Sequence, residues 1–210
     1  MKIKIIALIA ALAMPFAAWG DDKPGSTTTS DKTKTTEKTT DTSADKTTNK
    51  KEKLAEMDLQ VLAHVHHLNQ TEIMLGKLAQ KSGSTQAVKA YGQMLARDHQ
   101  SADKDLTAFA KKQDVKIPMD KPKEEADQKD QKDQKEAIAH LKTLKGNEFD
   151  TAFLQMMVQD HEKEIAKLDA NIGGIQNQDL ATILKDFKPA LQKHADQARE
   201  LQKTNAQAMK

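Results

Sequence analysis

Apolar residues recur at three- and four-residue spacings in four long segments of the chain, and a helix places such positions on one face. Ser82-Gly83-Ser84 separates the first two segments, and Gly173-Gly174 separates the last two. No later segment has the two-residue alternation of a half-buried strand. The pattern therefore predicts four amphipathic helices, at about 54–81, 85–113, 148–172 and 179–204.

The connection between the second and third segments is much longer than the other two. It runs from Val115 to Asn147 and contains Pro118, Pro122 and tandem Asp-Gln-Lys triplets. Near its end, Ile138, Leu141 and Leu144 predict one or two amphipathic turns, and the pattern leaves open whether the remainder is helical. Two short connections and one long one are typical of a ferritin-like four-helix bundle with a crossover, in which the second and third helices run parallel. We therefore predict an all-α fold over residues 54–207, with a kink at Pro189.

The residues before Leu54 predict two different segments. Residues 1–20 combine Lys2 and Lys4 with an apolar run and a small-residue end, which is typical of a signal peptide and predicts export to the periplasm or outer envelope. Residues 21–53 consist mostly of Thr, Lys, Asp and Ser, with Ala44 as their only aliphatic residue. Such a segment buries too little apolar surface to fold, so we predict a disordered linker.

Charge and composition exclude several classes of function. The chain has 33 Lys+Arg against 31 Asp+Glu, and loss of residues 1–20 leaves 31 of each. A neutral protein lacks the basic face that nucleic-acid binding requires. The absence of cysteine excludes disulfides, thiolate metal sites and a cysteine nucleophile. No segment of the mature chain approaches the roughly 20 apolar residues of a membrane-spanning helix.

One polar residue interrupts the apolar stripe of each predicted helix: Glu72, His99, His161 and His194. In a bundle these four side chains can converge in one layer. Imidazole and carboxylate suit Zn, Fe, Mn or Cu(II), so the pattern predicts a site for one divalent metal in the core.

Two of the histidines end a repeated hexamer, Met-x-x-x-Asp-His, at residues 94–99 and 156–161. The preceding residues, Asp98 and Asp160, point about 100° around their helices from the histidines. Each can therefore orient only a histidine on a neighbouring helix, as an outer-shell group of the site.

Two other interpretations stay open. The polar residues can form a metal-free layer that fixes helix register, in an envelope interaction or stress protein. A metal-dependent enzyme requires an open coordination position, and the Glu-x-x-His pattern of di-iron oxidases is missing, so a non-enzymatic role is the default. His64 and His67 share a helix face, which we interpret as a solvated patch rather than a surface metal site.

Three blocks of sequence resemble a known family. They are Gln93–His99, Gly146–Asp150 with Met156–Glu162, and Phe187–His194. Their residues, order and spacing are similar to those of exported bacterial proteins known as the domain of unknown function 4142 family, and Glu72 with Leu75–Ala79 resembles its first-helix block. The resemblance spans about Leu59 to Leu201. It implies a ferritin-like bundle in the periplasm or envelope, without a demonstrated activity.

Overall fold

The computed structural model describes residues 53–208, so the predicted signal peptide and almost all of the predicted linker lie outside the described residues. This part of the chain contains no strand, and the prediction of an all-α fold is confirmed. Within it, no helix has the length and apolar character needed to cross a membrane. The elements are α1 (Glu56–Ser82), α2 (Gln86–Lys112), α3 (Glu125–Leu141), α4 (Gly146–Asn171), the short 3-10 helix η1 (Ile172–Gly174) and α5 (Gln178–Ala208).

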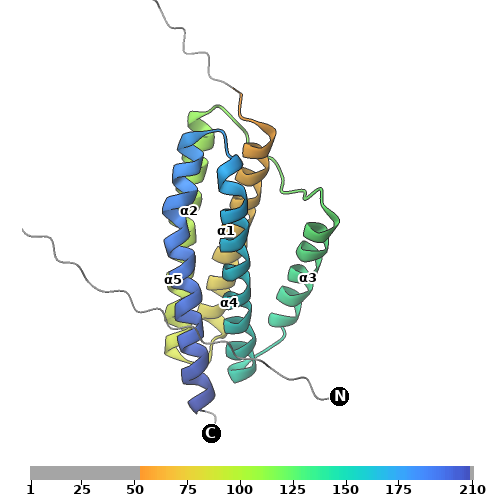
Figure 1. The fold of residues 1–210 in the computed structure, drawn as a ribbon. Coiled ribbons are helices and arrows are strands. Elements are labelled where there is room, and N and C mark those ends of the chain that lie inside the picture. Colours follow the sequence, from red (N-terminus) through yellow and green to blue (C-terminus); the bar gives the residue numbers. More distant parts are fainter. Residues whose placement is uncertain (1–52, 209–210) are drawn as a thin grey trace, which may run out of the picture. The chain divides into compact units, whose positions relative to one another are not determined.

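Four helices form a bundle from two hairpins. α1 packs against α2, and α4 packs against α5, while contacts of α2 with α5 and of α1 with α4 close the bundle. Figure 1 shows α1 and α5 running in one direction and α2 and α4 in the other. Since α2 and α4 are not direct neighbours, they lie across the bundle from each other and run parallel.

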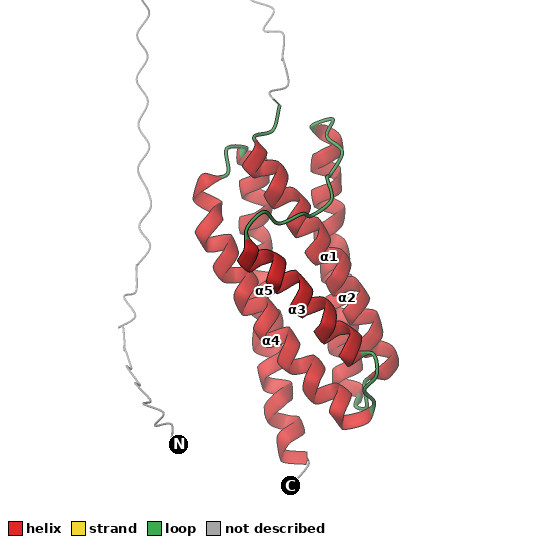
Figure 2. Cartoon of the chain, turned by 90° about the vertical axis from the view of Figure 1, so that its right-hand side faces the viewer, coloured by secondary structure: helices red, strands yellow, loops and turns green. Residues whose placement is uncertain are grey.

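The long connection contains a helix that the apolar pattern did not delimit. Its 17 residues include the Asp-Gln-Lys triplets, whereas we predicted only one or two turns near the end. Ion pairs of Asp127 with Lys167 and of Asp130 with Lys163 hold it to α4, and Ile138 is buried. Figure 2 shows α3 lying over the side of the bundle formed by α1 and α4.

Two buried aspartates hold the turns of the opposite hairpin. Asp150 of α4 accepts hydrogen bonds from the backbone N–H groups of Ser84 and Thr85, between α1 and α2. Asp58 of α1 accepts the equivalent bonds from Gln176 and Asn177, between α4 and α5. Carboxylates that accept backbone N–H groups at helix starts stabilise those ends. The two hairpins are therefore clamped reciprocally, as an internal repeat.

The apolar core is divided by a polar layer. One cluster contains Leu62, Leu106, Leu168 and Leu184, and the other contains Leu75, Leu95, Leu154 and Ala198. On each of the four bundle helices the polar residue that interrupts the stripe falls between residues of the two clusters. Glu72, His99, His161 and His194 therefore occupy the middle of the bundle.

Pro189 lies inside α5, and the helix continues through it to Ala208. Because proline lacks an N–H group, the carbonyl of Lys185 loses its helical partner. The residue lies just before His194, so this irregularity falls next to the polar layer.

Candidate metal centre

Three histidines meet in the polar layer. His99 of α2, His161 of α4 and His194 of α5 are each at most 2% exposed. One ligand nitrogen from each ring lies within 4.8 Å of the others. The centroids of the rings are 5.2 to 5.7 Å apart, and none of the pairs is stacked face to face. The bundle thus brings three imidazoles from three helices around one point.

Each histidine has one ring nitrogen bound to a group that accepts. His99 Nδ1 lies 2.9 Å from Asn69 Oδ1, and His161 Nδ1 lies 2.8 Å from the Met157 carbonyl. His194 Nε2 lies 3.2 Å from Asp98 Oδ2. Partial burial raises the pKa of Asp98, but hydrogen bonds from His194 and Arg97 hold its net pKa below the ordinary value, so its carboxylate is ionised. All three histidines therefore donate their N–H outward.

The remaining nitrogens carry lone pairs that face one another. His194 Nδ1 lies 3.3 Å from His161 Nε2. His99 Nε2 is buried and has no hydrogen-bond partner among the described residues. A tetrahedral site with metal–nitrogen bonds of about 2.0–2.1 Å separates neighbouring nitrogens by about 3.3 Å. The spacing of His161 and His194 fits such a site, and outward N–H groups held by acceptors are what metal-bound histidines show.

Burial keeps these imidazoles neutral. Desolvation, followed by the proximity of the other histidines, lowers the pKa of His99 far below its usual range and that of His161 to about 3. Desolvation also lowers the pKa of His194, although Asp98 opposes the shift. Neutral imidazole is the form that binds a metal, so at neutral pH the three histidines lose no proton when a metal binds.

Glu72 lies in the same layer but outside the group of mutually close ligand atoms. It is 1% exposed, and neither carboxyl oxygen has a hydrogen-bond partner within residues 53–208. Burial raises the pKa of Glu72 well above its ordinary value, and the nearby Asp160 and Glu164 raise it further. A buried carboxyl without a donor is costly unless a cation or proton compensates it.

The two copies of the hexamer place their aspartates differently. Asp98 reaches across to His194 of α5, whereas Asp160 accepts a hydrogen bond from Gln134 of α3 at 3.2 Å. Burial raises the pKa of Asp160, and Glu164 adds to the shift. Of the two predicted outer-shell groups, Asp98 contacts a histidine of the layer and Asp160 faces the crossover.

The expected solvated patch on α1 is wrong for His64, whose two ring nitrogens both contact acidic side chains, and the neighbouring His66 is paired as well. His64 Nε2 lies 3.0 Å from Glu164 Oε2, and His64 Nδ1 lies 3.3 Å from Asp120 Oδ2. Burial lowers the pKa of His64, but hydrogen bonds to Asp120 and Glu164 outweigh it and raise the pKa to about 10. His66 pairs with Asp103 at 2.6 Å. The acids that hold these side chains come from other helices or the crossover, so spacing along α1 did not reveal them.

Sequence reasoning missed Asn69 and Glu164. Asn69 adjoins Leu68 on the stripe of α1, so it looked like an edge position. Glu164 carried a usable signal: it follows Asp150 by the same fourteen residues that separate Glu72 from Asp58. Asp58 and Asp150 are the equivalent clamps of the two hairpins, so Glu72 and Glu164 are equivalent positions on α1 and α4.

Comparison with protein families identifies the chain. The model of a family described as a domain of unknown function, DUF4142, matches residues 43–201. The match covers more than half of the chain, so the chain belongs to this family, as the sequence blocks predicted. No curated protein and no solved structure matches the chain.

Proposed function

We propose that this DUF4142 protein binds one divalent transition-metal ion through His99, His161 and His194. The observation that carries the proposal is the direction of the ring nitrogens: Asn69, Met157 and Asp98 take the three N–H groups, which leaves three lone pairs around one point. Three imidazoles favour Zn²⁺ or Cu²⁺ over the oxygen-seeking Mg²⁺ and Ca²⁺, and the 3.3 Å between the His161 and His194 nitrogens fits tetrahedral Zn²⁺.

Glu72 is the best candidate for a fourth ligand. It is buried in the same layer and both of its oxygens lack a partner in the described part of the chain. A metal ion near this carboxyl favours its ionised form, so binding releases a proton. Ligation by Glu72 closes the coordination sphere, which supports metal binding or storage rather than catalysis.

A metal-free polar layer explains the same residues less well. Buried polar networks stabilise a fold when every member is satisfied. Here His161 and His194 direct lone pairs at each other, and His99 Nε2 and the Glu72 oxygens have no partner among residues 53–208. As a purely structural device the layer leaves these five buried atoms uncompensated, and a bound cation compensates them.

We also infer a ferritin-like arrangement and an exported protein. The parallel course of α2 and α4 and the crossover that joins them support the first inference. Lys2, Lys4 and the apolar run that follows support the second. In the periplasm or outer envelope, a metal-binding bundle without cysteine keeps its ligands under oxidising conditions.

Metal titration of the full chain, produced without an affinity tag and stripped with a chelator, tests the proposal. We expect one Zn²⁺ per chain and a stabilisation of about 2.7 kcal/mol at a hundredfold excess over Kd. His99→Ala and His161→Ala abolish the metal-dependent shift. His140→Ala, at an exposed position of α3, retains it and controls for nonspecific binding to histidine.

Two results contradict the proposal. The first is a wild-type melt that no divalent metal shifts. The second is an equal metal-dependent shift in wild type and in both histidine variants, since the ion then binds elsewhere. Co²⁺ gives a further check, because tetrahedral nitrogen ligation produces intense visible absorption that His161→Ala must remove.

A further inference from the structure

A row of three carboxylates lies between α1 and α4, outside the three-histidine centre, and two of them are buried while Asp160 is half-buried. Asp160 and Glu164 are one turn apart on α4, and Glu72 belongs to α1. Glu164 is 5% exposed, and its Oε1 has no partner in the described part of the chain, as is the case for both oxygens of Glu72. Glu72 lies near both Asp160 and Glu164, and three buried oxygens among these acidic groups have no donor, so this seam favours a cation.

The outer end of the row lies near solvent. Glu164 Oε2 binds His64, whose side chain is 35% exposed. The crossover closes this end, because Asp120 holds the other nitrogen of His64 and Gln134 of α3 holds Asp160. Figure 2 shows α3 lying along this side of the bundle. The outer carboxylates are therefore covered by the first part of α3, which ion pairs and one amide hydrogen bond hold to α4, whereas Ile138 and Leu141 near the end of α3 pack into the apolar core.

The inner end of the row reaches the histidine layer. Asp160 directly precedes His161 in α4. Glu72 lies one turn from Asn69, which holds His99. Burial raises the pKa of Tyr91, and the charge of Glu72 adds to this shift, while the Tyr91 hydroxyl donates to the His194 carbonyl. Glu72 thus lies between the outer carboxylates and the metal centre.

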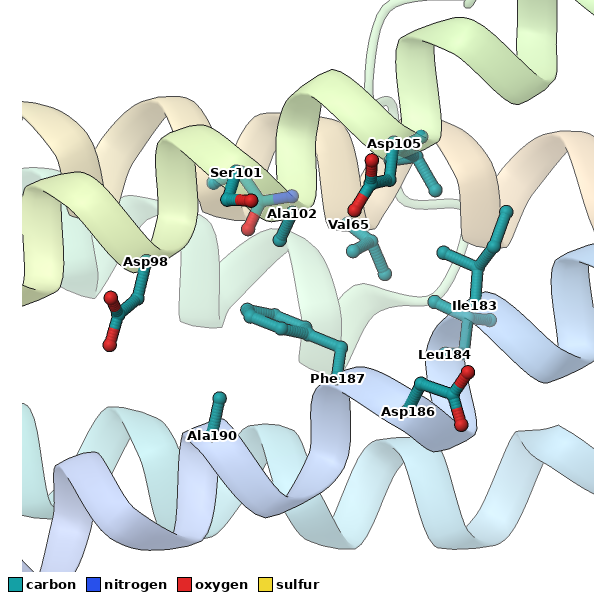
Figure 3. A pocket seen from close by; sticks show the side chains of 12 residues that line it. Val65, Asp98, Ser101, Ala102, Asp105, Ile183, Leu184, Asp186, Phe187 and Ala190 are labelled. Atoms are coloured by element: carbon teal, nitrogen blue, oxygen red, sulfur yellow. The ribbon is translucent and has the colours of Figure 1, made fainter.

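A pocket between α2 and α5 faces the N–H sides of the histidine rings, which do not bind a metal. This pocket of about 390 Å³ lies between α2 and α5, and Asp98, Asn69 and Phe187 line it. Figure 3 shows the ring of Phe187 rising from α5 towards α2, with Asp98 to one side. Asn69 and Asp98 hold the N–H sides of His99 and His194, so the lone pairs of both rings point away from the pocket.

We propose that the metal ion enters through the seam between α1 and α4 and passes along Glu164, Asp160 and Glu72 to the three histidines. This inference rests on the proposed metal centre. The ligand is a divalent cation, which exchanges its water for carboxylate oxygens before it meets imidazole. A row of carboxyl groups in a covered seam attracts such cations and accelerates their capture, and the arriving cation favours the ionised form of each group. The crossover limits entry, because a cation must displace its contacts with Asp160 and Glu164.

Stopped-flow binding of Co²⁺ to the metal-free full chain tests the route. Asp160→Asn combined with Glu164→Gln should lower the association rate at least tenfold. Dissociation slows by the same path, so Kd changes by less than about threefold. Asp105→Asn combined with Asp186→Asn removes the same charge from the rim of the α2–α5 pocket and leaves both rates unchanged. Asp127→Asn combined with Gln134→Ala loosens the crossover and accelerates binding severalfold.

Each alternative outcome is separable from failure of the metal centre. Slower binding in the Asp105 and Asp186 variant shows entry through the pocket and overturns the route. A loss of affinity at an unchanged association rate in the Asp160 and Glu164 variant identifies ligands rather than a path, which also overturns it. If the wild-type protein binds no Co²⁺, the proposed metal centre itself is contradicted. If all variants bind Co²⁺ at the wild-type rates, only the proposed entry route is contradicted. The Asp127 and Gln134 variant keeps all three carboxylates, so it tests the route if the Asp160 and Glu164 variant fails to fold. Faster Co²⁺ binding in this variant supports the route, and an unchanged rate overturns it.

Discussion

His194 Nδ1 and His161 Nε2 lie 3.3 Å apart, and neither nitrogen carries a proton when both rings are neutral. The proton of His194 is on Nε2, bound to Asp98, and the proton of His161 is on Nδ1, bound to the Met157 carbonyl. Two facing lone pairs repel each other unless a cation lies between them. Asp98 maintains this arrangement, since its carboxylate fixes the tautomer of His194.

Asp98→Asn should therefore weaken metal binding by about 10- to 100-fold, the usual effect of removing an outer-shell acceptor. The amide competes for the tautomer because its NH₂ group can donate to His194 Nε2. Asp105→Asn is the matched control, since Asp105 lies two turns further along α2 on the same pocket and contacts no histidine of the layer. Competition with a chromophoric chelator measures both affinities. Equal affinities for the two variants show that Asp98 does not act through His194.

Acid should destabilise the metal-free protein through the same histidines. Their folded-state pKa values are lowered from 6.5, so the unfolded chain binds more protons below that pH. The contribution of these three histidines to stability is complete above about pH 6.5 and is lost as the pH falls towards 3. The slope reaches about 1.4 kcal/mol per pH unit for each histidine. Urea unfolding at pH 7 and pH 5 measures it, and His161→Gln reduces the difference while His140→Gln does not.

The sequence predicted the helices well because their stripes are long and their ends carry glycine or proline. Helices expected at 85–113 and 179–204 are found at 86–112 and 178–208. The crossover helix was not delimited because its residues are nearly all polar: only Ile138 and Leu141 are buried in it. Its position depends on partners in α4, such as Lys163 and Lys167, which local periodicity cannot show.

Part of the candidate site could likewise be predicted from the sequence, and part could not. His99, His161 and His194 were predicted because each interrupts an apolar stripe, and a buried layer is the simplest reason for three such interruptions. The groups that accept the N–H bonds of these histidines could not be predicted from the sequence. Met157 contributes a backbone carbonyl, and Asn69 occupies a position beside the stripe. The repeated Met-x-x-x-Asp-His pattern was also misleading, since Asp98 contacts His194 whereas Asp160 contacts the crossover.

Alkaline conditions should release the contact that closes the seam. The folded-state pKa of His64 is raised to about 10, so its ion pairs with Asp120 and Glu164 stabilise the protein fully below pH 6.5. That contribution is lost as the pH rises from 6.5 to 10. Because the side chain is partly exposed, solvent screens the pairs and the effect is small. The fall in unfolding free energy between pH 7 and pH 9 should be smaller in His64→Gln than in wild type. An identical fall in both proteins shows that His64 is not charged in the folded state.

Close packing of α1 against α2 depends on two glycines. A Cβ atom at Gly76 meets the Gly92 carbonyl oxygen at 2.5 Å and the backbone nitrogen of Ala96 at 2.8 Å. Backbone atoms cannot move aside, so Gly76→Ala should cost about 1–3 kcal/mol or more. Gly173→Ala is the control, because a Cβ atom there meets nothing within 4 Å. Alanine also lowers the entropy of the unfolded chain, which stabilises the folded state slightly. Thermal melts of the metal-free variants compare them, and equal midpoints contradict close packing at Gly76.

Substitution of Glu72 should change the stability of the fold and the affinity for metal in opposite directions. Its buried carboxyl has no partner among the described residues, and proximity to Asp160 and Glu164 disfavours its charge. Because the raised pKa makes the folded state oppose ionisation, stability falls as the pH rises above 4.5. Glu72→Gln removes this ionisation and should raise the melting midpoint of the metal-free protein at pH 7 by about 2–4 °C per kcal/mol gained.

The same variant should weaken Zn²⁺ binding at least tenfold and abolish the proton released on binding, whereas Glu162→Gln, at an exposed position of α4, changes neither quantity. Calorimetry in two buffers of different ionisation enthalpy counts the proton. An unaltered affinity and proton release in Glu72→Gln exclude it as the fourth ligand, and a loss of stability without metal shows that its carboxyl has a structural role instead.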